Sequence, residues 1–224
     1  MKAREKNRHT ITLLFGVLGI ILSLLTVQAQ NSFELAPKLL GKVEKDHGPQ
    51  ASKRLVAWQD LIRDDQSVSD LEKLQKVNVF FNRVDFVSDL LLWKEKDYWA
   101  TPVEFLIQNG GDCEDFSIAK YFTLKKMGVD EDKLNMTYVK ALELNQAHMV
   151  VTYYNTPDAE PLVLDNLNTK ILLASQRADL MPVFSFNGSG LWLAKERSRG
   201  KKVGSSDRYK RWMDLLQRMP EGLN

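Results

Sequence analysis

The single cysteine of the chain, Cys113, is the residue whose chemistry most needs explaining. One cysteine among 224 residues cannot form a disulfide within the chain, and a lone cysteine is more often a small buried apolar residue than a reactive one. Gly110 and Gly111 precede it, and the apolar residues that follow predict a helix from Asp112-Cys113 to just before Gly128. A thiol is nucleophilic as its thiolate, and a helix N-terminus favours that charge.

A histidine partner for this thiol is nearly forced by elimination. The chain has three histidines: His9 lies near the N-terminus, His47 lies in a polar segment, and His148 begins a predicted strand over 148–154. An imidazole beside a cysteine takes the thiol proton and then stabilises the thiolate as imidazolium. His148 is therefore the predicted general base, although a single histidine at a strand start is usually structural.

Asp165 is the predicted third member of this site. It ends the apolar run Leu162-Val-Leu164 of a strand predicted over 161–165, where an unpaired carboxylate is costly. An imidazole N–H on the neighbouring strand is a suitable partner, since the pair fixes the tautomer and steadies the imidazolium. An aspartate at a strand end is also common in turns, so the prediction depends on the combination. The order Cys113, His148, Asp165 is that of a papain-like site in its transglutaminase-type permutation.

Helices are predicted to position the cysteine. Helical periodicity runs from residue 32 to about residue 83, and Ser69 with Glu72 forms a capping box that opens a helix inside this region. Thr101-Pro102, with Glu104 at the third helical position, predicts the start of the helix that precedes the nucleophile.

Strands are predicted to position the histidine and the aspartate. The β-rich segments are 136–142, 148–154 and 161–165, and the turn 143–146 joins the first two as a hairpin. The basic tail 195–218 carries Trp212, Leu215, Leu216 and Met219 on one side. We expect this tail to form a surface helix packed on the domain rather than a membrane contact.

The N-terminus has the features of a secretory signal. Lys2, Arg4, Lys6 and Arg8 precede the apolar run 11–27, and Val27-Gln28-Ala29 offers a small-residue cleavage site. Residues 1–29 are therefore predicted to be a signal peptide, and an uncleaved membrane anchor is the alternative. Residues 30–224 then form one domain with two lobes.

The charge of the mature chain gives no support to nucleic acid as a partner. The signal segment holds four of the 31 basic residues and one of the 29 acidic residues, which leaves 27 against 28 and a formal charge of −1. The basic character of the whole chain therefore belongs mostly to the signal segment.

Four segments resemble the bacterial transglutaminase-like cysteine proteinases of the LapG type. The segment Gly110–Gly128, with its Gly-Asp-Cys-Glu-Asp motif, resembles the nucleophile helix of that family, and Tyr98–Glu104 resembles its lead-in. Ala147–Val151 and Val163–Leu167 look like the strands that carry its histidine and aspartate. The resemblance spans about residues 58–167. It implies an α+β, papain-like and transglutaminase-like fold with a helical N-terminal lobe and an antiparallel sheet in the C-terminal lobe.

The same resemblance implies a function. Proteinases of this type are periplasmic and calcium-dependent, and they cleave the N-terminal region of a large surface adhesin, which releases the adhesin and disperses a biofilm. An inner-membrane cyclic di-GMP receptor of the LapD type sequesters the protease. Both the adhesin substrate and the receptor are expectations carried by the resemblance alone.

Three acids surround the cysteine, and they have two interpretations. Asp112, Glu114 and Asp115 oppose ionisation of the neighbouring thiol. In the first interpretation they cap the helix, interact favourably with the helix dipole and point away from the thiol. The residues alone favour this interpretation. As ligands they hold a hard cation that offsets their charge. The resemblance reverses the weighting and implies a Ca2+ site at Asp112 and Glu114, with Asp115 as a further ligand.

Two other functions remain compatible with these residues. A transglutaminase or a cell-wall amidase uses the same three groups with a different acceptor or substrate, and incorporation of a labelled amine identifies a transglutaminase. A non-catalytic periplasmic binding module can also keep the fold. The reactivity of Cys113 towards an active-site alkylator separates that module from an enzyme.

Overall fold

The computed structural model describes residues 33–64, 67–195 and 198–223. The predicted signal peptide 1–29 lies outside the described residues, so its cleavage and the start of the mature domain at residue 30 stay predictions. Within the described ranges, no helix is long and apolar enough to cross a membrane.

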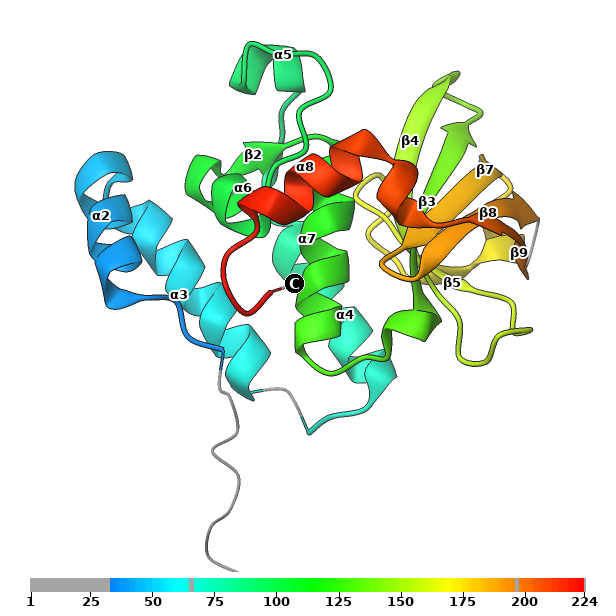
Figure 1. The fold of residues 1–224 in the computed structure, drawn as a ribbon, viewed down its shortest axis with the longest axis horizontal. Helices are drawn as coiled ribbons and strands as arrows, with labels where there is room; N and C mark the ends of the chain where they lie inside the picture. The colour runs from blue at the N-terminus through cyan, green and yellow to red at the C-terminus, as the bar shows by residue number, and fades with distance from the viewer. Residues whose placement is uncertain (1–32, 65–66, 196–197, 224) are drawn as a thin grey trace, which may run out of the picture. The chain divides into compact units, whose positions relative to one another are not determined.

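The helix that carries the cysteine lies at the centre of the fold. The helices are α2 (Pro37–His47), α3 (Pro49–Asp64), α4 (Asp70–Phe81), the short α5 (Asp89–Leu92), α6 (Pro102–Gln108), α7 (Cys113–Lys126) and α8 (Lys210–Arg218). Figure 1 shows α7 between the other helices and the sheet. Its residues from Asp115 to Leu124 are all buried. A helix covered on every side can carry apolar residues all round, and α7 does so.

A short parallel pair brings the segment before α5 next to the segment before α7. Its strands are β1 (Asp85–Phe86) and β2 (Gly110–Gly111), with Asp85 opposite Gly110. The pair places α5, which follows β1, beside the N-terminus of α7, which follows β2.

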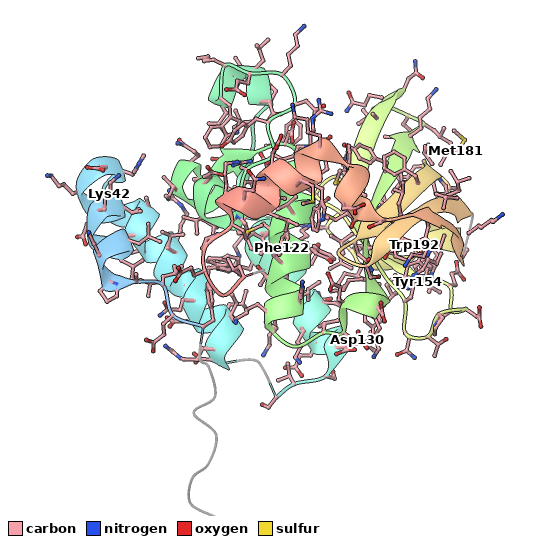
Figure 2. All side chains as sticks on the ribbon, in the orientation of Figure 1. Lys42, Phe122, Asp130, Tyr154, Met181 and Trp192 are labelled. Carbon is pink, nitrogen blue, oxygen red and sulfur yellow. The ribbon has the colours of Figure 1, made fainter. Side chains whose placement is uncertain are left out.

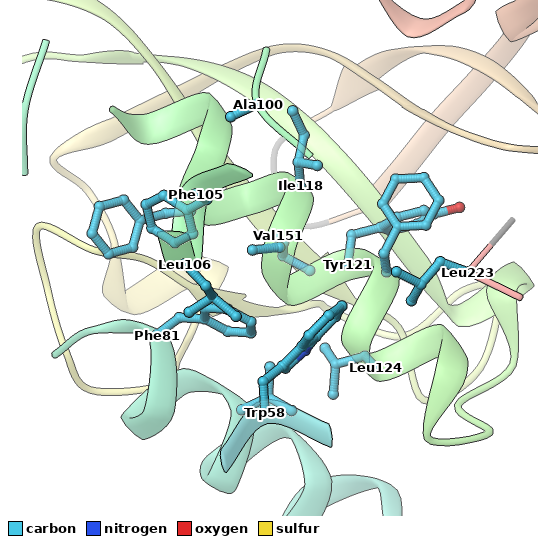
Figure 3. Packing of buried hydrophobic residues seen from close by; sticks show 14 of the residues in the cluster. Trp58, Phe81, Ala100, Phe105, Leu106, Ile118, Tyr121, Leu124, Val151 and Leu223 are labelled. Carbon is cyan, nitrogen blue, oxygen red and sulfur yellow. The ribbon is translucent and has the colours of Figure 1, made fainter. Parts of the chain in front are cut away.

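The main core surrounds α7 and includes residues of α3, α4, α6, α8 and the sheet. Figure 3 shows Trp58, Phe81, Phe105, Leu106, Ile118, Tyr121 and Leu124 packed together, all nearly inaccessible to solvent. Burying each such side chain contributes ~1.5–3 kcal/mol. One polar contact crosses this core: the indole Nε1 of Trp58 donates to Thr123 Oγ1 at 2.8 Å, and both residues are buried.

The sheet has seven antiparallel strands. They are β3 (Leu134–Ala141), β4 (Gln146–Tyr153), β5 (Leu162–Leu164), β6 (Leu172–Leu173), β7 (Leu180–Asn187), β8 (Gly190–Lys195) and β9 (Ser198–Gly204), in the order β6-β5-β4-β3-β7-β8-β9. The predicted fold class is confirmed. Thr152 of β4 lies opposite Val163 of β5, and because side chains alternate along a strand, His148 and Asp165 lie on the same face of the sheet.

The predicted elements around the cysteine agree closely with the structure. Thr101 and Glu104 form a complete capping box at the start of α6, and Asp112 is the N-cap of α7. Ser69 caps α4, because its side chain accepts a hydrogen bond from the Glu72 backbone N–H. A full capping box also needs a hydrogen bond from the Ser69 backbone N–H to the Glu72 side chain, and the contacts of these two described residues do not include it. The three predicted strands correspond to β3, β4 and β5.

The prediction for the basic tail was wrong over its first half. Residues 198–204 form β9, and only 210–218 are helical. The Arg199 guanidinium lies over the rings of Tyr154 and Trp192, 5.0 and 5.3 Å from their centroids, and Figure 2 shows those two rings close together on the sheet. Residues 198–204 contain glycine and several charged residues, so their strand propensity is low. They form a strand because they pair with β8 and because Arg199 stacks on the two rings. The apolar side of the tail helix is buried at Trp212 and Leu215, as expected.

Replacing Thr123 by valine should destabilise the core. The change keeps the shape of the side chain but leaves the buried Trp58 N–H without an acceptor, which costs about 1–3 kcal/mol of unfolding free energy. Urea denaturation followed by tryptophan fluorescence measures the loss. Thr156→Val, in an exposed turn, is the matched control and should change little; equal stability of the two variants would contradict the role of this hydrogen bond.

Candidate active site and cation site

Cys113 is the first residue of α7, at a tight junction between β2 and the helix. Asp112 caps the helix by accepting from the Glu114 backbone N–H at 3.3 Å, and Asp115 accepts from the Asp112 backbone N–H at 3.3 Å. A Cβ on Gly111 would lie 2.7 Å from the Phe105 ring, so glycine is needed for this close packing. The predicted capping role of these acids is therefore observed.

His148 and Asp165 form a buried pair on the adjacent strands. His148 Nε2 lies 2.7 Å from Asp165 Oδ1, and the two residues are 2% and 1% exposed. Burial alone raises the pKa of Asp165, but the hydrogen bond and charge of His148, together with Arg177 and the Leu167 N–H, bring the pKa down to about 2. Asp165 is therefore a carboxylate at neutral pH.

Strand β4 also reaches the thiol. The backbone N–H of Met149, the residue after His148, lies close enough to the Cys113 sulfur to act against the rise of the thiol pKa. The structure therefore brings the helix tip that carries Cys113 against the strand that carries His148. Because Nε2 of His148 is engaged by Asp165, its Nδ1 is the nitrogen left to exchange a proton with a nucleophile. The contacts join His148 to Asp165 and place the neighbouring Met149 against Cys113; that the three residues act together stays a prediction.

The surroundings of the thiol oppose its ionisation. Cys113 Sγ donates to Glu114 Oε2 at 2.8 Å. Burial raises the pKa of Cys113 far above its ordinary value, and the charge and hydrogen bond of Glu114 raise it further, while the Met149 N–H acts in the opposite direction. Offsetting the negative charge beside the thiol would therefore favour the thiolate.

Three carboxylates converge next to the nucleophile. Oxygen atoms of Asp89, Asp112 and Asp115 lie within 4.8 Å of one another. Burial and the neighbouring acids raise the pKa of Asp112 to about 9, burial raises the pKa of Asp89 to about 6, and burial raises that of Asp115 well above its ordinary value. Like charges in a space of little solvent destabilise one another, and a cation is the ordinary remedy.

Asp89 supplies the observation that fits a metal ion. Its Oδ2 accepts from the Tyr98 backbone N–H at 2.5 Å, whereas its buried Oδ1 has no hydrogen-bond partner among the described residues. A buried carboxylate oxygen without a donor is costly. Oxygen ligands from several carboxylates are what Ca2+ and Mg2+ prefer.

The predicted metal ligands divide between two groups. Asp112 and Asp115 belong to the three-carboxylate cluster, while Glu114 lies with Asp112 and the Cys113 sulfur in a second group. Sequence reasoning missed Asp89. The available signal was a carboxylate directly before the apolar run Leu90–Leu92, which is an unusual position for an unpaired acid.

Sequence reasoning also missed the residues that hold Asp165. Arg177 Nη2 donates to Asp165 Oδ2 at 2.7 Å. The Asp165 backbone carbonyl accepts from Asn82 Nδ2 at 2.9 Å and from Lys120 Nζ at 3.0 Å. Burial lowers the pKa of Lys120 to about 7. These donors come from the C-cap of α4, from α7 and from the turn after β6, and the sequence around Asp165 contains no sign of them.

Comparisons with known proteins agree with this geometry. The family model of the bacterial transglutaminase-like cysteine proteinases matches residues 56–181. The EGTA-treated structure of Legionella pneumophila LapG is 45% identical, covers 82% of this chain and 97% of its own, and has a TM-score of 0.72. The calcium-bound structure of the same protein is 44% identical, covers 82% of this chain and 99% of its own, and has a TM-score of 0.70. No curated protein matches the chain.

Replacing Glu114 by glutamine should make the cysteine more reactive in metal-free protein. The change removes the charge that raises the pKa of Cys113, so the thiolate fraction at a given pH rises, by about tenfold for one pKa unit. The rate of labelling by iodoacetamide, followed by mass spectrometry in excess chelator, measures it without background because Cys113 is the only cysteine.

The exposed acid Glu44 of α2 provides the matched control for this labelling experiment. Glu44→Gln should label at the wild-type rate, and Cys113→Ala should not label. A Glu114→Gln variant that labels no faster than wild type would show that Glu114 does not set the ionisation of the thiol.

Proposed function

We propose that this chain, which belongs to the family of bacterial transglutaminase-like cysteine proteinases, is a calcium-dependent cysteine endopeptidase of the periplasm. Cys113 is its nucleophile, His148 its general base and acid, and Asp165 the residue that orients His148. One observation carries the proposal: His148 Nε2 and Asp165 Oδ1 form a buried pair at 2.7 Å, and the next residue of the His148 strand, Met149, lies against the helix-tip cysteine.

The reaction follows from these positions. His148 Nδ1 takes the proton of Cys113, and the thiolate attacks the scissile carbonyl carbon. Backbone N–H groups in the first turn of α7, which have no acceptor within the helix, are available for the oxyanion. The His148 imidazolium then protonates the leaving amine, and a thioester to Cys113 remains. Water, deprotonated by His148, hydrolyses this thioester and restores the thiol.

Asp165 keeps His148 in the state that this cycle needs. Its carboxylate accepts from Nε2, which leaves Nδ1 free as the acceptor of the thiol proton. When His148 becomes an imidazolium, the same carboxylate stabilises the new charge. Because the pKa of Asp165 is about 2, it does not take the proton itself.

A calcium ion is the proposed cofactor of this site. Asp89, Asp112 and Asp115 would hold it, and Asp89 Oδ1 is the buried oxygen that needs a partner. The bound ion would supply positive charge beside the nucleophile. The solved structures of L. pneumophila LapG include one that is calcium-bound and one that is EGTA-treated, which supports calcium over magnesium here.

The substrate and the regulator are proposed from the family. The substrate is the N-terminal region of a large surface adhesin, and its cleavage releases the adhesin and promotes dispersal of a biofilm. The inhibitory partner is an inner-membrane cyclic di-GMP receptor of the LapD type. The signal-like sequence of residues 1–29 supports export to the compartment where these partners would meet.

Purified protein should cleave the purified N-terminal region of a large adhesin from the same genome in the presence of calcium. Cys113→Ala should show no cleavage, and Asp165→Asn should reduce kcat by up to ~10⁴-fold because His148 then takes the wrong tautomer. Gel electrophoresis and mass spectrometry of the products measure both effects. Cleavage that persists in Cys113→Ala, or incorporation of a labelled amine in place of hydrolysis, would overturn the endopeptidase proposal.

Calcium should also stabilise the protein through Asp89. In chelator, Asp89→Asn should have a higher melting temperature than wild type, because one repelling charge is gone. With calcium at about 100 times its Kd, the unfolding free energy of wild type should rise by ~2.7 kcal/mol, which corresponds to ~5–10 °C in melting temperature. The variant should gain much less. Scanning fluorimetry measures both melting temperatures. Asp158→Asn, in an exposed turn, is the control and should follow wild type. An equal calcium shift in Asp89→Asn would exclude Asp89 as a ligand.

A further inference from the structure

Arg177 is a buried cation behind the predicted catalytic pair. It follows the short 3-10 turn Ala174–Gln176, and its side chain is 2% exposed. Its Nη2 donates to Asp165 Oδ2 at 2.7 Å and to Asp179 Oδ2 at 2.8 Å, while its Nε donates to Asp179 Oδ1 at 2.9 Å. Arg177 therefore joins the buried Asp165 to the partly exposed Asp179.

The two oxygens of Asp165 have separate partners. Oδ1 accepts from His148 Nε2 at 2.7 Å and from the Leu167 backbone N–H at 3.0 Å, and Oδ2 accepts from Arg177. A carboxylate bonded on both oxygens cannot rotate about its χ2 angle without losing a charge-assisted hydrogen bond. The guanidinium therefore fixes the direction in which Oδ1 faces the imidazole.

We infer that Arg177 is a positioning residue for the proteolytic reaction, which holds the Asp165 carboxylate aimed at His148 throughout the catalytic cycle. The inference rests on the proposed function of Cys113, His148 and Asp165. The side-chain partners of Arg177 are Asp165 and Asp179, so it would act on the reaction through Asp165.

The catalytic cycle gives the physical reason for a permanent cation at this place. His148 is positive only while it carries a proton taken from the thiol or from water, and it is neutral in the other steps. In those steps a carboxylate that is 1% exposed would have no full charge beside its side chain, and burial would favour its protonation. Arginine stays protonated at every pH of interest. It therefore keeps Asp165 ionised while the charge on His148 alternates.

The other charged groups near Asp165 cannot replace Arg177. Lys120 of α7 donates to the Asp165 backbone carbonyl, not to its carboxylate, and burial lowers the pKa of Lys120 to about 7, so its charge changes near neutral pH. Asp179 is an acid whose pKa Arg177 lowers. Arg177 is thus the one fixed positive charge in hydrogen-bond contact with the carboxylate among the described residues.

Three variants separate positioning from folding. Arg177→Ala removes the cation, Arg177→Lys keeps a charge but loses the fork that reaches Asp165 and Asp179 together, and Asp179→Asn weakens the tether from a side chain that is 37% exposed. Arg63→Ala, an exposed arginine of α3 with its own ion pairs, is the matched control. Circular dichroism and melting temperature identify the variants that fold.

The first readout is the split between kcat and KM with an adhesin fragment in calcium. Arg177→Ala should lower kcat by about 10- to 100-fold, less than the ~10⁴-fold expected for Asp165→Asn, with little change in KM. The acid limb of the pH profile should move to higher pH, because Asp165 is protonated more easily without the guanidinium. Arg177→Lys and Asp179→Asn should show smaller changes in the same direction.

The second readout does not depend on a substrate. The ring nitrogens of His148, observed by ¹⁵N NMR and assigned by their loss in His148→Ala, should report one tautomer protonated at Nε2 in wild type. The same spectrum should show a mixture of tautomers in Arg177→Ala. If no adhesin is cleaved, the proposed function fails while this spectrum still tests Arg177.

The inference is overturned if the folded variants behave as wild type. If Arg177→Ala does not fold, Arg177→Lys and Asp179→Asn decide the question. Wild-type kcat, an unmoved acid limb and an unchanged His148 tautomer in those variants would show that Arg177 only stabilises the turn. An equal loss of kcat in the Arg63→Ala control would also contradict the inference, because the effect on kcat would then not be specific to Arg177.

Discussion

Negative charge crowded around a buried thiol is the constraint on which this site depends. The N-terminus of α7 favours anions, and the sequence uses that preference for Asp112 and Asp115 as helix caps. The same terminus carries Cys113, so the groups that stabilise the helix compete with the charge that the nucleophile needs. Asp89 adds a third carboxylate to the cluster, and Glu114 bonds the thiol directly. These acids act to keep the thiol protonated, and a cation beside them would offset that effect.

The two halves of the site meet the cost of buried charge in different ways. On the strand side, Asp165 is compensated within the chain by His148, by Arg177 and by the Leu167 N–H. Its ionisation is therefore built into the fold. On the helix side, no cation is bonded to the three-carboxylate cluster among the described residues. The proposed calcium ion would supply that compensation, so one half of the site would be charged by the fold and the other half by the bound ion.

The sequence predicted the parts of the site that depend on local patterns. Cys113 was found from a helix start after two glycines, and His148 and Asp165 from the alternation and ends of strands, because each signal lies within a few residues of the side chain concerned. Asp89 and Arg177 were missed because tertiary pairing brings them in: the β1–β2 pair carries Asp89 beside α7, and the turn after β6 carries Arg177 back to Asp165. No periodicity in the sequence encodes either approach.

The same distinction explains the errors in the fold. The helical part and β3 to β5 have strong amphipathic or β-branched patterns, and they were predicted. Strand β9 has glycines and charges, and it exists because β8 offers a partner edge and because Arg199 lies over Tyr154 and Trp192. Tertiary contacts of this kind override weak local propensity.

Helix α7 connects the two halves of the site as a rigid spacer. Cys113 begins the helix, and Lys120 follows seven residues later. Because each residue turns the helix by about 100° and advances it by ~1.5 Å, the two side chains leave the helix within roughly 20° of the same direction and about 10 Å apart along its axis. Lys120 Nζ bonds the Asp165 carbonyl and Asn82 Oδ1, at 3.0 and 2.7 Å. The helix that presents the nucleophile therefore also anchors the strand end that carries the acid. A buried lysine with a lowered pKa is an expensive residue to keep in a core. Its place on α7 gives the reason, because its hydrogen bond holds the Asp165 backbone in position relative to Cys113. In the proposed reaction His148, which Asp165 orients, passes the thiol proton to the leaving amine.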